Sequence, residues 1–393
     1  MLFRIKNKLC SQKLKKIDTY RNPSDYVDHM ALYEKIMSRN SLDINVLEEI
    51  QKAKKVGLFI PSTQNKSLWH NIWPLLEGKE VLYIDSANWD HADIYIISGI
   101  GRGVKSYLER VNYMQTPCYS IDETFFKSVM PFSMSVGNDE VNESLFKGVS
   151  LFLDTRGIHF FPGITTQLEH SINSDELVSG DNLEKSRKLI DKIVENKLSK
   201  YNCQPVLKPS LPNNDKKNVL VIDQAYRDFS VAISGAEDES FENMLNQAIK
   251  ENPECNIIIK THVDKVSNAT YFSRLELPEN VIVYSDQINP MSLMEEIDKV
   301  YCYSSTVGWE ALLVGKKVHV FGSPIYAGWG LTEDRRGFSH RRLKKRSLEE
   351  LFYFIYLKHS VYVNPETNRV CDIEEAIDYI IEKRNDFLQQ FKG

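Results

Sequence analysis

The sequence predicts an α/β protein built from two Rossmann-like domains that face a central cleft. The chain has 393 residues, 42% of them hydrophobic and 26% charged, which is enough for two globular domains with separate cores. In both halves, short β-rich runs alternate with segments of helical spacing, which is the pattern of parallel sheets. A polar stretch with three prolines, residues 202–218, is interpreted as the interdomain linker. Two such domains in tandem favour a ligand at the carboxyl ends of the two sheets.

Residues 1–205 are expected to form the first domain. Its β-rich runs predict four strands, at 56–61, 80–85, 93–101 and 116–122, and helical spacing predicts helices over 102–114 and 172–200. Because these runs alternate with helical segments, we expect a parallel sheet.

Residues 206–350 are expected to form the second domain. Apolar runs predict strands at 218–223, 256–262, 280–285, 299–305 and 317–323, and periodicity predicts helices at 239–250, 290–298 and 307–314. The last segment, 351–393, predicts C-terminal helices that pack back toward the first domain.

Composition excludes several classes of protein. The longest apolar runs, such as VLVI at 219–222, are far shorter than a membrane span, and residues 1–16 lack the apolar core of a signal peptide. The six cysteines show no CxxC spacing, which fits neither a zinc site nor a disulfide framework. We therefore expect a cytoplasmic protein with reduced, structural thiols.

Two stretches are strongly basic although the net charge is −5. Residues 1–16 hold six Arg or Lys and no acid, and residues 335–346, RRGFSHRRLKKR, hold seven. Either could attract a sugar nucleotide, a phospholipid surface or a nucleic acid, and a solvated surface segment is the alternative. For residues 1–16, a solvated surface segment and peripheral contact with the inner face of the cytoplasmic membrane are equally weighted interpretations. No nucleic acid is expected, because no recognised binding module accompanies the charge.

The stretch from 304 to 315 has the pattern of a phosphate-binding turn. Ser304, Ser305 and Thr306 lie between a predicted strand and a predicted helix, where hydroxyls and backbone N–H groups bind phosphate. Glu310 follows about one turn later, within reach of a ribose hydroxyl, and Gly315 ends the helix. A plain helix cap with a surface glutamate is the alternative. The aromatic turn that follows favours a nucleotide-sugar site.

At this point the chain resembles a known family. Residues 304–334, SSTVGWEALLVGKKVHVFGSPIYAGWGLTED, resemble the signature of capsule polysaccharide synthesis proteins that act as β-Kdo glycosyltransferases using CMP-Kdo. The similarity extends through KNVLVIDQAYRDFSV, NPECNIIIKTHVD, RRLKKRSLEELFYFIYL and YVNPETNRVCDIEEAI, and more thinly through SIDETFFKS, DTRGIHF and KLSKYN.

The resemblance implies a two-domain GT-B-type transferase that retains the β configuration of the donor sugar. CMP-Kdo would be the donor, and a saccharide, free or lipid-linked, the acceptor on the side of the first domain. Other polysaccharide assembly proteins would be partners. Neither a cofactor nor a metal is expected, because no Asp-x-Asp is placed to chelate a diphosphate and a CMP donor carries a single phosphate.

Retention by double displacement requires a carboxylate nucleophile and an acid/base group for the acceptor. In DQAYRDFS, Asp228 matches the family's nucleophile position best and Asp223 is the second candidate. In SIDETFFKS, Glu123 is the preferred general base and Asp122 the alternative. The family has a glycine where this chain has Thr124. Without the resemblance, an acid after a strand is more often a cap or turn former.

Three cationic side chains are candidate anion-binding residues, and two of them, Lys260 and His262, match a motif of the family. His262 would bind and neutralise the departing CMP phosphate, and Lys260 would pair with that phosphate or the Kdo carboxylate. The family usually has Lys-Pro-His-Pro where this chain has Lys-Thr-His-Val, so both prolines are absent. Arg102 could meet an anionic sugar, and a surface arginine is the equally weighted alternative.

The aromatic turn YAGWG supplies the last candidates. Tyr326 and Trp329 could stack on cytosine or shape the donor pocket, and interdomain packing is the alternative.

Two other functions fit the sequence. One is a noncatalytic capsule assembly or export partner, which the departures at 122–124 and 261–263 permit. The other is a different sugar-nucleotide enzyme of the same fold. The joint presence of Asp228, His262 and the 304–310 turn favours the transferase.

Overall fold

The computed structural model contains two compact units. It describes residues 24–60, 66–83, 91–99, 104–131, 143–161, 163–212, 214–226, 228–234, 236–262, 270–338 and 340–390. Among these, unit 1 comprises residues 177–352 and 387–390, and unit 2 comprises residues 24–176 and 353–386. The chain therefore changes unit at 176/177, 352/353 and 386/387, and not at the expected linker.

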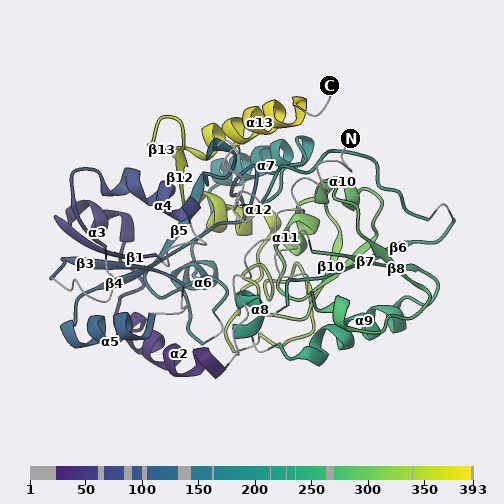
Figure 1. Cartoon of the computed structure of the whole chain (residues 1–393), viewed down its shortest axis with the longest axis horizontal. Helices are drawn as coiled ribbons and strands as arrows, with labels where there is room; N and C mark the ends of the chain where they lie inside the picture. Colours follow the sequence, from purple (N-terminus) through teal and green to yellow (C-terminus); the bar gives the residue numbers. More distant parts are fainter. Residues whose placement is uncertain are drawn as a thin grey trace, which may run out of the picture. The chain divides into compact units, whose positions relative to one another are not determined.

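Unit 1 is built on a six-stranded parallel sheet in the order β11-β10-β9-β6-β7-β8 (Figure 1). Its strands are β6 (Asn218–Ile222), β7 (Asn256–Lys260), β8 (Val281–Tyr284), β9 (Lys299–Cys302), β10 (Lys317–Val320) and β11 (Glu333–Asp334). The first five are the strands that apolar runs predict. The central residues of β6 and β7 are buried on both faces, which explains their continuous Val and Ile runs, whereas the edge strand β8 is partly exposed.

Helices cover both faces of this sheet (Figure 1). The helices of unit 1 are α7 (Gly180–Glu195), α8 (Phe229–Ile233), α9 (Asp238–Glu251), α10 (Pro290–Met294), α11 (Thr306–Leu313) and α12 (Leu348–Phe352), with a 3₁₀ turn at Phe272–Arg274. Helix α9 packs on β6 and β9, and its Phe241 ring stacks on Tyr271 with a centroid distance of 3.9 Å. Figure 1 shows α10 and α11 on the opposite face from α9.

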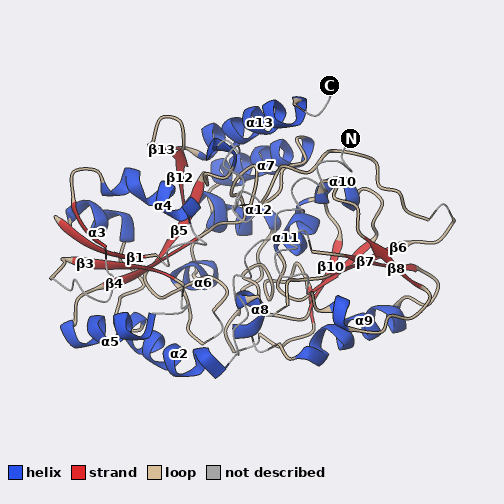
Figure 2. Ribbon diagram, in the orientation of Figure 1, coloured by secondary structure: helices blue, strands red, loops and turns tan. Residues whose placement is uncertain are grey.

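Unit 2 has a seven-stranded mixed sheet in the order β13-β12-β5-β4-β3-β1-β2 (Figure 2). Its strands are β1 (Lys55–Phe59), β2 (Glu80–Tyr83), β3 (Ile94–Ser98), β4 (Cys118–Asp122), β5 (Ser150–Asp154), β12 (Ser360–Asn364) and β13 (Arg369–Cys371). The predicted parallel sheet holds for β1 to β4 only, because β5, β12 and β13 pair antiparallel. Antiparallel neighbours need no helical crossover, so strand–helix alternation does not reveal them.

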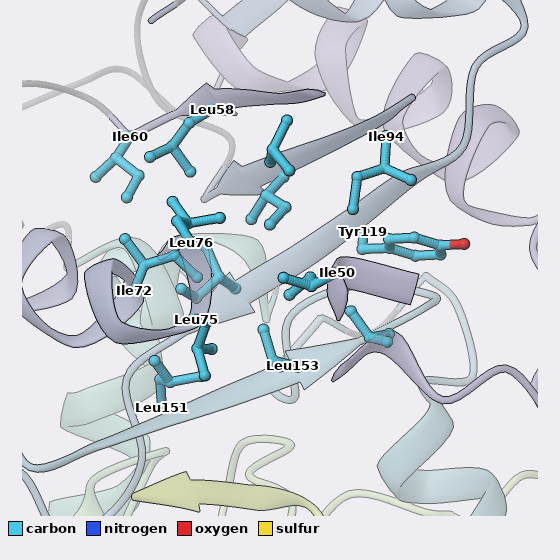
Figure 3. Close-up of a cluster of buried hydrophobic side chains, with 14 of the residues drawn as sticks. Ile50, Leu58, Ile60, Ile72, Leu75, Leu76, Ile94, Tyr119, Leu151 and Leu153 are labelled. Atoms are coloured by element: carbon cyan, nitrogen blue, oxygen red, sulfur yellow. The ribbon is translucent and has the colours of Figure 1, made fainter. Parts of the chain in front are cut away.

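The helices of unit 2 are α2 (Ser24–Met37), α3 (Val46–Lys52), α4 (Lys66–Ile72), α5 (Val104–Met114), α6 (Gln167–Asn173) and α13 (Ile373–Gln389), with short turns at Trp73–Leu76, Glu143–Leu145 and Tyr353–Lys358. Figure 3 shows the core between the sheet and the first helices, where Ile50, Ile72 and Leu76 meet Leu58, Ile94 and Leu151. These side chains are at most 4% exposed, so the hydrophobic effect holds the helices on the sheet. Within the described ranges, every helix is too short or too polar to span a bilayer.

Candidate functional site

The sheet of unit 1 has a topological switch point between β6 and β9. From β6 the chain builds β7 and β8 on one side, and it then returns to build β9, β10 and β11 on the other. In open α/β sheets, ligands bind beyond the carboxyl ends of the strands at such a point. Gln224 follows β6 and Ser304 follows β9. The Ser304 N–H donates to Gln224 Oε1 at 3.0 Å, and Gln224 Nε2 donates to Ser304 Oγ at 3.4 Å.

The predicted phosphate turn lies at this switch point and begins helix α11. Ser305 is the N-cap residue, and its Oγ accepts the N–H of Val307 at 3.2 Å. Thr306 is partly exposed at the first helical position. A Cβ at Gly308 would collide with the Tyr326 hydroxyl and would lie 2.7 Å from Cys302 Sγ. Glycine therefore lets the helix approach the strand closely, and the partial positive charge of the helix N-terminus faces the edge.

Tyr326 and Trp329 are both 0% exposed. The Tyr326 hydroxyl donates to the Ser305 carbonyl at 2.6 Å, and Trp329 Nε1 donates to the Ile325 carbonyl at 2.6 Å. With their rings enclosed, these residues shape the turn from within unit 1. This packing does not offer a ring face for a base.

Glu310 is also interior, at 4% exposure. Its Oε1 accepts the backbone N–H of Lys200 at 3.0 Å. Burial raises the pKa of Glu310 to about 7, while the Lys200 N–H, the hydroxyl of Ser199 and the charge of Lys260 act in the opposite direction. In this structure, Glu310 therefore binds the 199–200 segment, and the predicted contact with a ribose is not what its position provides.

Lys260, at the end of β7, is 5% exposed. Burial lowers its pKa to about 8, and the carboxylates of Glu310 and Asp286 oppose that shift. Its ammonium lies 5.9 Å from the centroid of the Tyr284 ring. Lys260 was predicted to contact a donor anion directly. In this structure its side chain is buried at the carboxyl edge of the sheet. His262, two residues later, is partly exposed, and its charge acts to lower the pKa of Asp223.

The two candidate nucleophiles differ in environment. Asp223 is 2% exposed, and its Oδ1 accepts the N–H groups of Gln224 and Phe272. Burial raises its pKa. Asp228 is partly exposed and caps helix α8, where its Oδ1 accepts the Ser230 N–H at 2.9 Å. Asp228 is thus the more accessible carboxylate, with Ser230 orienting one oxygen.

In unit 2, Asp122 and Glu123 end strand β4. Glu123 forms an ion pair with Lys127, whose side chain is 5% exposed. Asp122 Oδ1 accepts the Glu123 N–H at 2.8 Å, and its Oδ2 lies 3.6 Å from His159 Nδ1. Thr124, which stands where the family has glycine, is buried and bonds to Phe126 and Ser150.

Arg102 and the basic residues 1–16 lie outside the described residues. In the second basic run, four arginines bind other parts of unit 1. Arg335 pairs with Glu251 at 2.7 Å and Arg346 with Glu350 at 3.1 Å. Arg336 donates to the Ser234 carbonyl, and Arg342 donates to the carbonyls of Pro324 and Ala327, both at 2.6 Å. This run is largely a structural strap, which neither of the two sequence interpretations expected.

Two residues of the candidate site were not predicted. Gln224 stands next to Asp223 in the quoted DQAYRDFS motif, so its position after a buried strand was a signal that could have found it. His159 lies in DTRGIHF, 37 residues from Asp122, and only the pairing of β4 with β5 brings the two close.

Comparisons with known proteins agree with this arrangement. The family model for capsule polysaccharide biosynthesis proteins matches residues 179–366. The matched segment, just under half of the chain, resembles this family and contains the switch point, the 304–306 turn and the arginine strap.

Curated relatives of the family match across both units. The chain is 32% identical over 287 residues to the capsule polysaccharide modification protein LipA of Neisseria meningitidis serogroup A, covering 70% of this chain and 39% of LipA. It is 33% identical over 273 residues to the lipopolysaccharide-processing protein LpsZ of Rhizobium meliloti, covering 68% of this chain and 60% of LpsZ. The chain thus spans less than two thirds of the length of these relatives.

Solved structures of the same kind share the fold. The Thermosulfurimonas dismutans KpsC beta Kdo 2,4 transferase has a TM-score of 0.72 and 27% identity, covering 84% of this chain and 98% of that one. The beta Kdo 2,7 transferase of that KpsC has a TM-score of 0.61 at 19% identity, covering 84% and 99%, which shows a common fold. The chain therefore has the two Rossmann-like units of the GT-B-type glycosyltransferase fold.

Proposed function

We propose that this chain is a retaining β-Kdo glycosyltransferase. It would transfer Kdo from CMP-β-Kdo to a saccharide acceptor, free or lipid-linked, in the synthesis of a capsule or another surface polysaccharide. The observation that carries the proposal is the serine–threonine turn at the switch point of unit 1. Asp228 and His262, which lie in motifs that resemble those of the family, support it. The likeness to the beta Kdo 2,4 transferase over 98% of that chain supports the choice of sugar.

In the first half-reaction, the Asp228 carboxylate attacks the anomeric carbon of the donor sugar. The bond from that carbon to the CMP phosphate oxygen breaks, and its electron pair leaves with CMP. The N-terminus of α11 and the 304–306 hydroxyls favour the departing phosphate, because backbone N–H groups and the helix dipole attract anions. His262, partly exposed beyond β7, neutralises the same group.

In the second half-reaction, an acceptor hydroxyl attacks the glycosyl–Asp228 intermediate. The bond to Asp228 breaks and its electron pair returns to the carboxylate, while the hydroxyl proton passes to a carboxylate of unit 2. Two displacements, each with inversion, retain the configuration of the sugar. We assign the proton acceptor to Asp122 and not to Glu123, because the buried Lys127 ammonium already neutralises Glu123.

Trapping the covalent intermediate tests the proposal. Purified protein is incubated with CMP-Kdo without acceptor, and intact mass and peptide mapping follow. We expect an added Kdo mass on the peptide that carries Asp228, and its absence in Asp228→Ala. Asp223→Asn is the matched control: it removes the neighbouring carboxylate and should still form the adduct on Asp228.

Two outcomes contradict the proposal in different ways. An adduct on Asp223 would reassign the nucleophile within the same reaction. Failure to bind CMP together with failure to release it from CMP-Kdo would remove the transferase function, and would favour a noncatalytic assembly partner of the same fold.

A further inference from the structure

Unit 2 contains a small cavity beside Asp122. Ser120, Asp122, Asp154, His159 and His359 line it together with apolar side chains. These residues come from β4, from β5 and the loop after it, and from the segment before β12, so strands that are distant in sequence build the cavity. Polar groups around a small cavity fix one another's orientation, because a buried polar atom without a partner is destabilising.

The imidazole of His159 is held in a fixed orientation by aromatic neighbours. Its ring centroid lies 5.4 Å from that of Phe125 with an interplanar angle of 87°, and 5.0 Å from that of Phe152 with an angle of 58°. The side chain is 11% exposed, and Nδ1 lies 3.6 Å from Asp122 Oδ2. This separation is longer than a hydrogen bond, and catalytic hydrogen bonds are often long before a substrate binds and shorten in the complex.

Asp122 is therefore contacted from two sides. Its Oδ1 accepts the Glu123 N–H at 2.8 Å, and its Oδ2 faces the His159 ring.

The other titratable groups around the cavity have different partners. Asp154 accepts backbone N–H groups of four residues, Arg156, Gly157, Gln167 and Leu168. His359 Nε2 lies 2.8 Å from Ser171 Oγ, and burial lowers the His359 pKa to about 3, so this ring stays neutral. Tyr33 of α2 bonds to Ser120, and burial raises its pKa far above 10.

We infer that His159 is a positioning residue for Asp122: it donates Nδ1–H to Oδ2 and fixes the carboxylate that accepts the acceptor proton. This inference rests on the proposed function and adds a residue to it. In the step concerned, the acceptor oxygen bonds to the anomeric carbon, the bond to Asp228 breaks with its electron pair, and the hydroxyl proton moves to Asp122. His159 keeps its own proton throughout, so it acts through Asp122 alone.

The two half-reactions separate this role from a structural one. His159→Phe should slow the acceptor-dependent step about tenfold to a hundredfold, the range for loss of an orienting hydrogen-bond partner. It should leave adduct formation from CMP-Kdo without acceptor unchanged, because that step uses Asp228. His159→Asn, whose amide replaces Nδ1, should restore much of the rate. Rapid-quench kinetics of both steps on the full chain provides the measurement.

His359→Phe is the matched control, since it replaces the other imidazole of the cavity, which contacts Ser171 and not Asp122. Equal slowing of both steps in His159→Phe, or an acceptor step that is equally slow in His359→Phe, would overturn the inference. An unchanged acceptor step in His159→Phe would overturn it too.

A readout without donor or acceptor distinguishes failure of the pairing from failure of the function. In the wild-type protein, the ¹⁵N shift of His159 Nδ1 should report a protonated nitrogen, and Asp122→Asn should change it. If the shift responds but the protein neither binds CMP nor releases it, the pairing stands while the proposed function and the catalytic role fail. If the shift does not respond, the pairing itself is refuted.

Discussion

Glu310 ties two segments of unit 1 together. It lies on α11 directly behind the 304–306 turn, and its Oε1 binds the backbone of Lys200. The sequence pattern placed this carboxylate one turn into a helix beside a phosphate site, and the structure places it there but facing inward. Its role in this structure is to hold the chain before the predicted linker against α11. That contact helps explain why residues 177–217 belong to unit 1.

Glu310→Gln should change how stability depends on pH. Burial raises the folded pKa of Glu310 to about 7 from 4.5, so the folded chain binds this proton more tightly than the unfolded chain does. Its contribution to stability is therefore present below about pH 4.5 and is lost as pH rises through about 7. Urea unfolding at several pH values should show a steeper fall for wild type than for the variant across this window.

Glu310→Ala provides the comparison at fixed pH. It leaves the Lys200 N–H without its acceptor and should cost about 1–3 kcal/mol of unfolding free energy. If the unfolding free energies of wild type and Glu310→Gln changed in parallel with pH, the raised pKa of Glu310 would be contradicted.

The arginine strap, residues 335–346, shows how an element can differ from what its composition suggests. Seven cations in twelve residues predicted an anion-binding or solvated surface. Arg342 instead lies 7% exposed, against Phe338 with a guanidinium-to-centroid distance of 4.5 Å. It holds the turn that carries Tyr326 by donating to two of its carbonyls, so the strap supports the 304–306 turn from behind.

Arg342→Met should destabilise unit 1 by about 3 kcal/mol, because it removes the hydrogen bonds from a charged group to the carbonyls of Ser323, Pro324 and Ala327. Lys345→Met, an exposed cation of the same strap, is the matched control and should change stability by less than about 0.5 kcal/mol. Thermal unfolding measures both. Similar melting temperatures for the two variants would show that the strap is a surface segment after all.

At the scale of the whole molecule, the chain passes from unit 2 to unit 1 at residue 177 and returns at residue 353. The segment after residue 352 was predicted to form helices that pack on the N-terminal domain, and in the structure it also adds strands to unit 2. Its strand β12 pairs with β5 and β13 pairs with β12, so the sheet of unit 2 is complete only with residues near the end of the chain.

Truncation after Phe352 should therefore destabilise unit 2 and leave the stability of the unit 1 sheet largely unchanged. The truncation removes β12, β13 and the whole of α13, and β5 becomes an edge strand that pairs only with β4. Hydrogen exchange should show β4 and β5 losing protection while β6 and β7 keep it, since the unit 1 sheet lies wholly within 218–334. Uniform loss of protection would mean that the units do not fold independently; unchanged protection in β5 would mean that β12 is dispensable.

The fold was largely predictable wherever a local pattern carried it. All five strands predicted for unit 1 and the first four of unit 2 formed, because continuous Val and Ile runs mark buried parallel strands. Strands β5, β12 and β13 were not predicted, because they pair antiparallel and the strand–helix alternation that marks a parallel sheet does not indicate them. The linker was misplaced because proline content indicates a turn-rich segment but not which unit it packs on.

For the candidate site, sequence by itself determined which residues stand at the carboxyl ends of β6, β7 and β9, and it determined the resemblance that links Asp228 and the 304–306 turn to sugar transfer. Only the tertiary structure decided which way each side chain faces. It turned Glu310, Lys260 and Tyr326 inward, left Asp228 and His262 partly exposed, and placed His159 beside Asp122. The reason is physical: chain order sets the end of a strand, whereas burial and hydrogen-bond partners come from segments that only the folded sheet brings together.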